Sequence, residues 1–173
     1  MPKSSMRKSS LRKLSMRTLG VPAAATVVLL ATTAGAVAAS SSSISAARPA
    51  AVKISTRTLP KLGVVLVDST GRTLYMFVPD QRRRVTCVGT CAVVWPPVKL
   101  AKGQKPTSSG KVKPSLLGSD PNPAGGRVVT YNKWPLYTYV ADTKPGQATG
   151  QALKLNGGLW YVLAPSGKVI RTK

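Results

Sequence analysis

The chain has 173 residues, enough for one domain or two small ones. It carries 26 Lys and Arg against four Asp, with no Glu and no His, a net charge of +22. The lack of His excludes His-dependent nucleophile triads and argues against a metal site, while the charge predicts attraction to polyanions and says nothing about fold.

Residues 1–39 have the composition of a secretory signal peptide. Six cations precede an apolar run from Leu19 to Ala31, and small residues follow. The candidate cleavage tripeptide is Ala36-Val37-Ala38, and an uncleaved N-terminal anchor is the alternative. After cleavage we expect no integral membrane span, and residues 40–173 would keep 20 cations and four anions, a net charge of +16.

The segment after the signal peptide predicts a linker and then a first hairpin. Residues 40–59 are rich in Ser, Ala and Thr without an apolar period, so we expect a disordered linker before a domain at residues 60–173. Val64–Val67 is a short apolar run, and Asp68–Gly71 is a turn signal. Thr73–Val78 has the pattern of a second strand. The two strands and the turn between them predict a β-hairpin.

Two cysteines and a short helix come next. Cys87 and Cys91 are the only thiols, and an even count outside the cytoplasm predicts a disulfide, for which Gly89 must let the chain bend. A redox-active thiol pair and a soft-metal site are the alternatives. Thr90 is a candidate helix N-cap, and the prolines after Trp95 stop the chain from continuing as a helix, so one helical turn is expected.

The second half predicts loops and more short strands. Lys99–Lys113 and Asp120–Gly126 are rich in Gly, Pro, Ser or Lys and are expected as exposed loops. Strands are expected at Arg127–Tyr131, Trp134–Val140, Leu159–Leu163 and Val169–Ile170, with tight turns at Asn132-Lys133, Asn156–Gly158 and Pro165–Gly167. The chain is therefore predicted to be mainly β, with antiparallel strands and hairpins and one short helix near the Cys pair.

The most informative pattern is a motif that occurs twice, 62 residues apart. Leu74–Asp80 and Leu136–Asp142 both contain Tyr-x-aromatic-x-x-Asp, and a Trp follows each copy. The motif residues are Tyr75, Phe77, Asp80 and Trp95 in the first copy and Tyr137, Tyr139, Asp142 and Trp160 in the second. Such a repeat indicates one structural unit used twice, so the β domain is expected to consist of two related repeats.

Together with Cys87–Ala92 and Gly157–Val162, the two motifs resemble the bacterial secreted-repeat family, which comprises predicted lipoproteins of unknown function. The resemblance covers residues 64–169 and implies a secreted protein of the extracytoplasmic cell envelope. Two features depart from the family. Gln81–Thr86 stands where members commonly have Gly and Ser, and the lipid-attachment Cys of many members is missing.

The motif residues allow a structural and a functional interpretation. Asp80 and Asp142 follow strand ends, where Asp accepts hydrogen bonds from downstream backbone, so we expect both to cap turns. A Ca²⁺ ligand role and paired acid/base catalysis are the alternatives. The motif aromatics are expected in the core, and a stacking platform for sugars or bases is their alternative role.

Basic residues suggest the function. Arg82, Arg83 and Arg84 directly follow the first motif, and the Lys99–Lys113 segment adds five cations. We expect a non-enzymatic β module, without a cofactor, that binds an anionic cell-envelope polymer or anionic lipid, and nucleic acid only non-specifically. A plain solvated, solubilising face is the simpler interpretation. An extracytoplasmic redox-active or small-ligand-binding protein, using the Cys pair and the aromatic cluster, is the alternative function.

Overall fold

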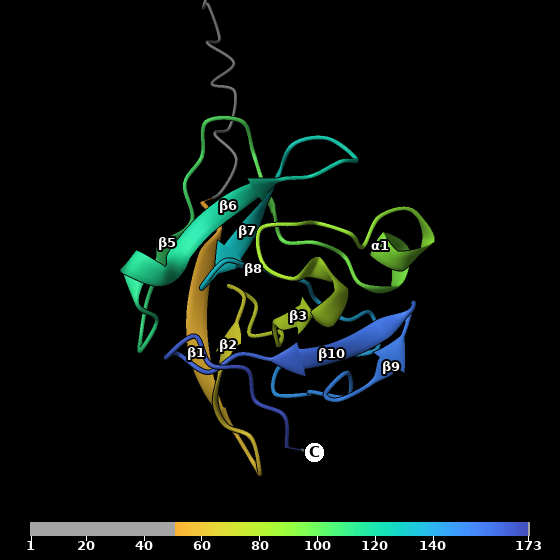
Figure 1. Ribbon diagram of the computed structural model, residues 1–173. Coiled ribbons are helices and arrows are strands. Elements are labelled where there is room, and N and C mark those ends of the chain that lie inside the picture. The colour runs from red at the N-terminus through yellow and green to blue at the C-terminus, as the bar shows by residue number, and fades with distance from the viewer. Residues whose placement is uncertain (1–50, 173) are drawn as a thin grey trace, which may run out of the picture. The chain divides into compact units, whose positions relative to one another are not determined.

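The computed structural model describes residues 51–172, so the expected signal peptide or anchor in residues 1–39 lies outside the described residues. In chain order the elements are β1 (Lys53–Leu59), β2 (Gly63–Val67), β3 (Tyr75–Phe77), η1 (Val78–Asp80), α1 (Thr90–Val94), β4 (Lys99–Leu100), β5 (Thr107–Ser108), η2 (Pro114–Leu116), β6 (Leu117–Pro121), β7 (Arg127–Tyr131), β8 (Trp134–Pro135), β9 (Lys154–Leu155) and β10 (Gly158–Val162) (Figure 1). The predicted fold class is confirmed: short strands dominate, and the one α-helix of the described range lies beside the Cys pair.

The strands form three small sheets. Their orders are β2-β1-β5, β3-β10-β9 and β4-β7-β6, and β8 also pairs with β7. The pairs are antiparallel except for the parallel pair of β1 and β5. In the third sheet β6 lies at one end of the strand order and pairs with β7, so β6 is an edge strand.

The first strand corrects the end of the expected linker at residues 40–59, of which residues 40–50 lie outside the described residues. β1 occupies the end of that segment and pairs with β2 from Ser55 through Leu59. Ile54 and Leu59 are buried in the two cores, while the Ser, Thr and Arg residues between them are partly or fully exposed. Only two apolar side chains anchor the strand, so composition alone does not reveal it.

The expected hairpins are shorter than predicted. Val67 and Thr73 form a single bridge around the Asp68 turn, and the chain then leaves β2 so that β3 pairs with β10 instead. In the second half only Trp134-Pro135 pairs back onto β7, and Tyr137 bridges to Tyr75. Long-range pairing therefore replaces the local pairing that the sequence favours.

Two segments expected as loops contain strands. Lys99–Lys113 includes β4 and β5 and buries Leu100 and Val112, while Asp120 belongs to β6 rather than to a loop. These strands have two to five residues and no clear alternation, so their partners, not their own sequences, define them.

The core is divided into two clusters on either side of β3. Tyr75 and Phe77 pack in one cluster with Trp95 and Trp160, while Met76 packs in the other. Successive side chains of β3 thus point to opposite sides, and both of its faces are buried. β3 is therefore an internal element on which both halves of the domain converge.

The two repeats pair with each other through their backbones. Tyr75 and Tyr137, which occupy equivalent motif positions, donate backbone hydrogen bonds to each other's carbonyl oxygens over 2.8 and 3.0 Å. β3 of the first repeat pairs with β10 of the second. In return, Thr138 and Val140 of the second repeat donate to the carbonyl oxygens of Pro96 and Val94 in the first. Each repeat thus completes the other's sheet, with an approximate two-fold relation between Tyr75 and Tyr137.

Candidate functional site

The motif tyrosines and aspartates pair across the two repeats. The Tyr75 hydroxyl donates to Asp142 Oδ2 over 2.5 Å, and the Tyr137 hydroxyl donates to Asp80 Oδ2 over 2.8 Å. All four side chains are buried. Each repeat therefore supplies a hydroxyl to the carboxylate of the other, an arrangement that the sequence analysis did not foresee. The repeated Tyr and Asp spacing was the signal, but nothing in it indicates that the bond crosses between copies.

The second carboxylate oxygen closes a loop within its own repeat. Asp80 Oδ1 accepts from the backbone N and the Oγ1 of Thr86, over 2.8 and 2.6 Å. Asp142 Oδ1 accepts the same two bonds from Thr149, over 2.9 and 2.6 Å. Both aspartates were expected to cap turns, and both do accept bonds from downstream backbone, but from residues six and seven positions away, so each closes a longer loop. Each aspartate thus has both of its oxygens engaged.

Burial sets the protonation of these groups. It raises the pKa of Asp80 above its ordinary value, and the hydrogen bonds from Thr86 and Tyr137 oppose this effect. Burial also raises the pKa of Tyr75 and Tyr137, and the adjacent carboxylates raise both further. Both phenols therefore stay protonated and act as hydrogen-bond donors, as the pairing with Asp requires.

The motif aromatics form one continuous stack. Phe77 stacks on Trp160 at 4.1 Å between ring centroids, Trp160 on Trp95 at 3.8 Å, and Trp95 on Tyr139 at 4.1 Å. Tyr75 meets the edge of this stack at Trp95, and Tyr137 meets it at Trp160. Both Trp side chains are fully buried, so the rings pack on one another and leave these indole faces closed to a sugar or a base.

The Cys pair lies at the end of this core. Cys87 and Cys91 form a disulfide with 5.2 Å between their Cα atoms, as predicted. Gly89 adopts a left-handed φ of 57° between them, which makes the required bend. Thr90 is not the N-cap: it is the first residue of α1, and Gly89 holds the cap position without a side-chain hydrogen bond.

The arginine run has an unusual backbone. Gln81, Arg82 and Arg83 have φ angles of 48°, 61° and 59°, a left-handed region that glycine occupies without strain. All three arginines are exposed, and the Arg83 backbone N donates to the Lys133 carbonyl oxygen over 2.8 Å. The chain therefore places charged side chains where small residues would be less strained.

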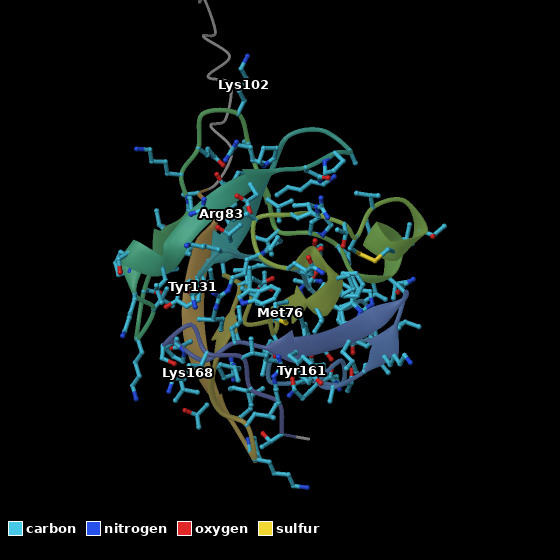
Figure 2. The ribbon with its side chains drawn as sticks, viewed as in Figure 1. Met76, Arg83, Lys102, Tyr131, Tyr161 and Lys168 are labelled. Atoms are coloured by element: carbon cyan, nitrogen blue, oxygen red, sulfur yellow. A yellow bond between two sulfur atoms is a disulfide. The ribbon has the colours of Figure 1, made fainter. Side chains whose placement is uncertain are left out.

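Three adjoining hollows surround the edge strand β6. They have volumes of about 290, 390 and 540 Å³, and all three are lined by Ser119 of that strand. The cations that line them are Arg83, Lys102, Lys105, Arg127 and Lys133. Figure 2 shows Lys102 on the loop beyond the end of β6 and Arg83 beside the strand. We call this region the β6 basic face.

The β6 basic face combines predicted and unpredicted residues. Arg83 of the expected arginine cluster lies in the same hollow as Lys133, and two lysines of the Lys99–Lys113 segment share another hollow with Arg127. The sequence analysis missed Arg127 and Lys133, because they belong to the second repeat and reach this face only through the fold. Arg82 lies over the Trp134 ring, 5.6 Å from its centroid.

One carboxylate lies within this basic region. Asp120 of β6 lines the same hollow as Arg83, and its Oδ2 atom is buried without a hydrogen-bond partner. Burial raises the pKa of Asp120, while Arg127 and Arg83 lower it. The two arginines thus partly compensate a carboxylate that the fold withdraws from water, and the surrounding surface remains basic.

The described residues contain neither a metal-binding cluster nor a membrane-spanning helix. Within residues 51–172 no group of three or more His, Cys, Asp or Glu side chains comes together to hold a metal ion. In the same range no helix has the length and apolar character needed to cross a membrane.

Comparison with known proteins identifies the family. A family described as a secreted repeat of unknown function matches residues 56–99 and 121–164, which contain the first and the second motif respectively. No curated protein and no solved structure matches the chain. The resemblance drawn from the motifs is thereby confirmed, and so is the secreted location that it implies. Since the two matched segments together cover just over half of the sequence, the chain belongs to this family of secreted repeats.

Proposed function

We propose that this protein is a non-enzymatic binding module of the bacterial cell envelope, and that the β6 basic face binds an anionic polymer. The buried Tyr–Asp pairs and the aromatic stack are the framework that holds this face in place. The observation that carries the proposal is the gathering of five cations around one edge strand.

The overall charge distribution supports the proposal. Residues 51–172 contain 18 Lys and Arg against four Asp, a net charge of +14, and every cation except Arg72 is well exposed. Asp80 and Asp142 are buried in the framework, and Asp68 is paired with Arg72 at 3.4 Å. The surface therefore presents almost unopposed positive charge, which attracts polyanions through release of their counterions.

The backbone strain in the arginine run also supports the proposal. A non-glycine residue in the left-handed region costs of order 1 kcal/mol, and three consecutive residues have this conformation. Strain of this kind persists where the side chain serves a purpose other than stability. Arg83, which lines a hollow of the β6 basic face, is one of the three.

The use of the buried groups supports the proposal that the module is non-enzymatic. Both oxygens of Asp80 and of Asp142 accept hydrogen bonds, and the two tyrosine hydroxyls donate to them. These groups are enclosed away from substrate, and the chain has no His to take their place. Acid/base chemistry would need such a group within reach of a bound molecule, and Asp120, the carboxylate that does line a hollow, has no second carboxylate beside it in that lining.

The alternative is a redox function for the Cys pair. Cys87 is almost fully buried, with 1% of its surface exposed, and only Cys91 is partly accessible. This favours a structural disulfide over an exchanging one. Titration of the native protein with a mild reductant tests the point, and rapid, reversible reduction of the pair under native conditions would favour the redox function.

The binding proposal is tested by the salt dependence of polymer binding. The secreted protein is titrated with a polyglycerol phosphate, a polyuronate and duplex DNA over a range of salt concentrations. Binding should weaken steeply as salt rises and similarly for all three polymers, because point charges carry little sugar or sequence information. Anionic lipid vesicles serve as a comparison surface.

Two triple variants of equal net charge separate position from total charge. Lys102→Gln, Lys105→Gln and Arg127→Gln remove three cations from the β6 basic face. The matched control replaces Lys144, Lys154 and Lys168, which lie outside the three hollows, with Gln. The first variant should lower the slope of log affinity against log salt by up to about three, and the control by much less. Equal effects would show that net charge alone attracts the polymer, and salt-independent binding would contradict the proposal.

A further inference from the structure

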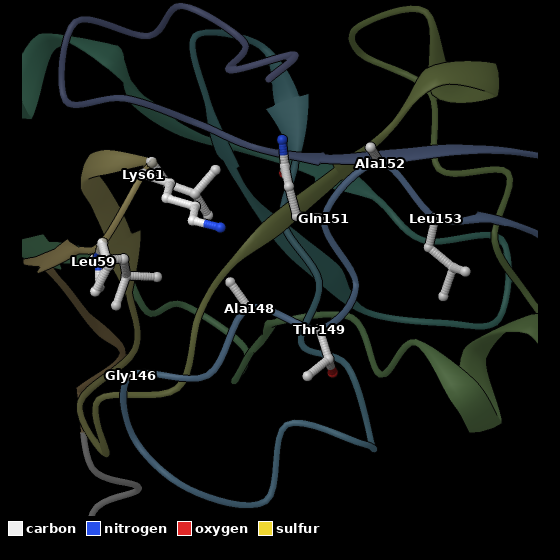
Figure 3. A pocket seen from close by; sticks show the side chains of 10 residues that line it. Leu59, Lys61, Gly146, Ala148, Thr149, Gln151, Ala152 and Leu153 are labelled. Carbon is white, nitrogen blue, oxygen red and sulfur yellow. The ribbon is translucent and has the colours of Figure 1, made fainter. Parts of the chain in front are cut away.

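A separate pocket lies on the other side of the Tyr–Asp framework. It has a volume of about 460 Å³ and lies between the turn that joins β1 to β2 and the loop that follows Asp142 (Figure 3). Its lining residues are Leu59, Pro60, Lys61, Leu62, Gly146, Ala148, Thr149, Gln151, Ala152 and Leu153. None of them lines the β6 hollows. The volume is in the range of small-molecule sites, about 300–1,000 Å³.

The wall of this pocket is held in place by the motif residues. Thr149 donates its backbone N–H and its hydroxyl to Asp142, whose other oxygen accepts from Tyr75. The Gly150 backbone N donates to the Tyr75 hydroxyl over 3.3 Å. The loop is therefore tied to the inter-repeat framework and the pocket is preformed, which reduces the entropy lost when a ligand binds.

The polar side chains of the wall are already engaged. Gln151 donates its amide N–H groups to the carbonyl oxygens of Ile170 and Thr172, and its Oε1 accepts from the Val162 backbone N. The Thr149 hydroxyl is bonded to Asp142. Neither side chain is free to recognise a polar ligand group, so the available surface of the wall is mainly aliphatic.

Lys61 supplies the charge of this pocket. It is the one charged residue of the lining, and among residues 51–172 no carboxylate pairs with its ammonium group. Figure 3 shows this ammonium directed inward, toward the side of the pocket on which Gln151 lies. A cation at the rim of an aliphatic pocket matches a molecule with a hydrocarbon body and one anionic end.

We propose that this pocket binds a small aliphatic carboxylate. The hydrocarbon chain lies against Leu59, Leu62 and Leu153, and the carboxylate pairs with the Lys61 ammonium. A neutral molecule of the same shape would gain the apolar contacts alone, and an aliphatic amine would meet the Lys61 charge. Because the site shares no lining residue with the β6 basic face, its occupancy is independent of polymer binding.

Calorimetric titration of the secreted protein with straight-chain carboxylates from butanoate to decanoate tests this proposal. Affinity should rise by up to about fourfold for each methylene group that the pocket buries, and then level off when the pocket is full. The matched alcohols should show the same dependence on chain length with weaker binding. No binding of decanoate, or binding that does not depend on chain length, would overturn the proposal.

Variants locate the site. Ala148→Leu adds bulk at a Cβ directed into the pocket (Figure 3) and should abolish carboxylate binding. Lys61→Gln should weaken the binding of carboxylates by up to about fivefold, which is the scale of an exposed ion pair, and should leave the binding of alcohols unchanged. Lys154→Gln, an exposed lysine outside the pocket, is the charge-matched control. Equal binding by Lys61→Gln and Lys154→Gln would overturn the role of Lys61.

Two further readouts keep the test independent of folding and of the polymer site. Thermal unfolding establishes that Ala148→Leu is folded, and if it is not, chain-length dependence and Lys61→Gln decide the question. Polymer binding by Lys61→Gln should match that of Lys154→Gln. If the polymer does not bind but decanoate binds as described, only the proposed polymer function fails.

Discussion

Removal of one hydroxyl tests whether the Tyr–Asp pairs hold the repeats together. Tyr137→Phe leaves the ring in place and removes two bonds to the first repeat: the one that the hydroxyl donates to Asp80 Oδ2 over 2.8 Å, and the one that it accepts from the Cys87 backbone N. Both side chains are completely buried, so water cannot replace the lost donor. Asp80 keeps its two bonds from Thr86, so the variant isolates the inter-repeat contact.

The expected loss of stability depends on the charge of the acceptor, the Asp80 carboxylate. A hydrogen bond to a charged group contributes about 1.5–3 kcal/mol, and a buried carboxylate left without a donor loses at least that much. We therefore expect Tyr137→Phe to lower the free energy of unfolding by about 2–3 kcal/mol near neutral pH, measured by chemical denaturation. For a domain of this size, that is a large fraction of the total stability.

The loss should also depend on pH. Burial raises the pKa of Asp80 in the folded state, so the folded protein holds this proton more tightly than the unfolded chain does. Such a group contributes stability below its unfolded pKa, and the contribution is lost as pH rises through its folded pKa. The bond from Tyr137 lowers the pKa of Asp80, so Tyr137→Phe raises this pKa further. The variant therefore loses more stability than the wild type does as pH rises through the folded-state pKa of Asp80. The stability gap between variant and wild type should be widest at neutral pH and narrow in acid.

Tyr131→Phe is the matched control. Tyr131 is buried, and its hydroxyl donates to the neutral Pro165 backbone oxygen over 2.6 Å and accepts from the Lys113 backbone N over 2.9 Å, so both variants lose one bond accepted from a backbone N–H and differ in the charge of the group that accepts the hydroxyl proton. This variant should lose only about 1 kcal/mol, without the acid-dependent change. The reasoning is refuted if Tyr137→Phe loses less than about 0.5 kcal/mol, or if the two variants have the same dependence on pH.

Three further predictions concern the disulfide, the aromatic stack and the strained arginine run. Cys87→Ser should lower the free energy of unfolding by about 2 kcal/mol in denaturant titrations and leave the fold intact, because the closed loop is short; free thiols in the exported protein would contradict this account. Trp160→Ala should cost about 3–5 kcal/mol in the same assay, because Trp160 is stacked between Phe77 and Trp95; wild-type stability would contradict its role as a core anchor. Arg83→Gly should raise the thermal midpoint slightly, by relief of up to about 1 kcal/mol of strain, and weaken polymer binding; a lower midpoint would refute the strain argument.

The repeat made much of the fold predictable from sequence. The motif predicted a strand that includes β3, and the Asn132-Lys133 turn follows β7 as expected. β1 and β6 could not be found in this way, because their inward apolar residues are few and their partners lie elsewhere in the chain. Short strands take their conformation from the neighbour that pairs with them.

The candidate sites were only partly visible in the sequence. Asp80 and Asp142 were expected to cap turns, but their tyrosine donors come from the opposite repeat, 57 and 67 residues away. The arginine run marked one part of the β6 basic face, while Arg127 and Lys133 join it through the pairing of β6 with β7. The aliphatic pocket had no sequence signal, since its two walls are distant segments of ordinary composition.

The central claim is that anionic polymers bind at the β6 basic face and not over the whole cationic surface. A nitrogen-15 NMR titration of the secreted protein with a polyglycerol phosphate at low salt tests it most directly. The account predicts that shifted backbone amides cluster at Gln81–Arg84, Ala101–Lys105, Leu117–Asp120 and Arg127, and that added salt reverses the shifts. Shifts of equal size around Lys154 and Lys168, or no shifts at low salt, would contradict it.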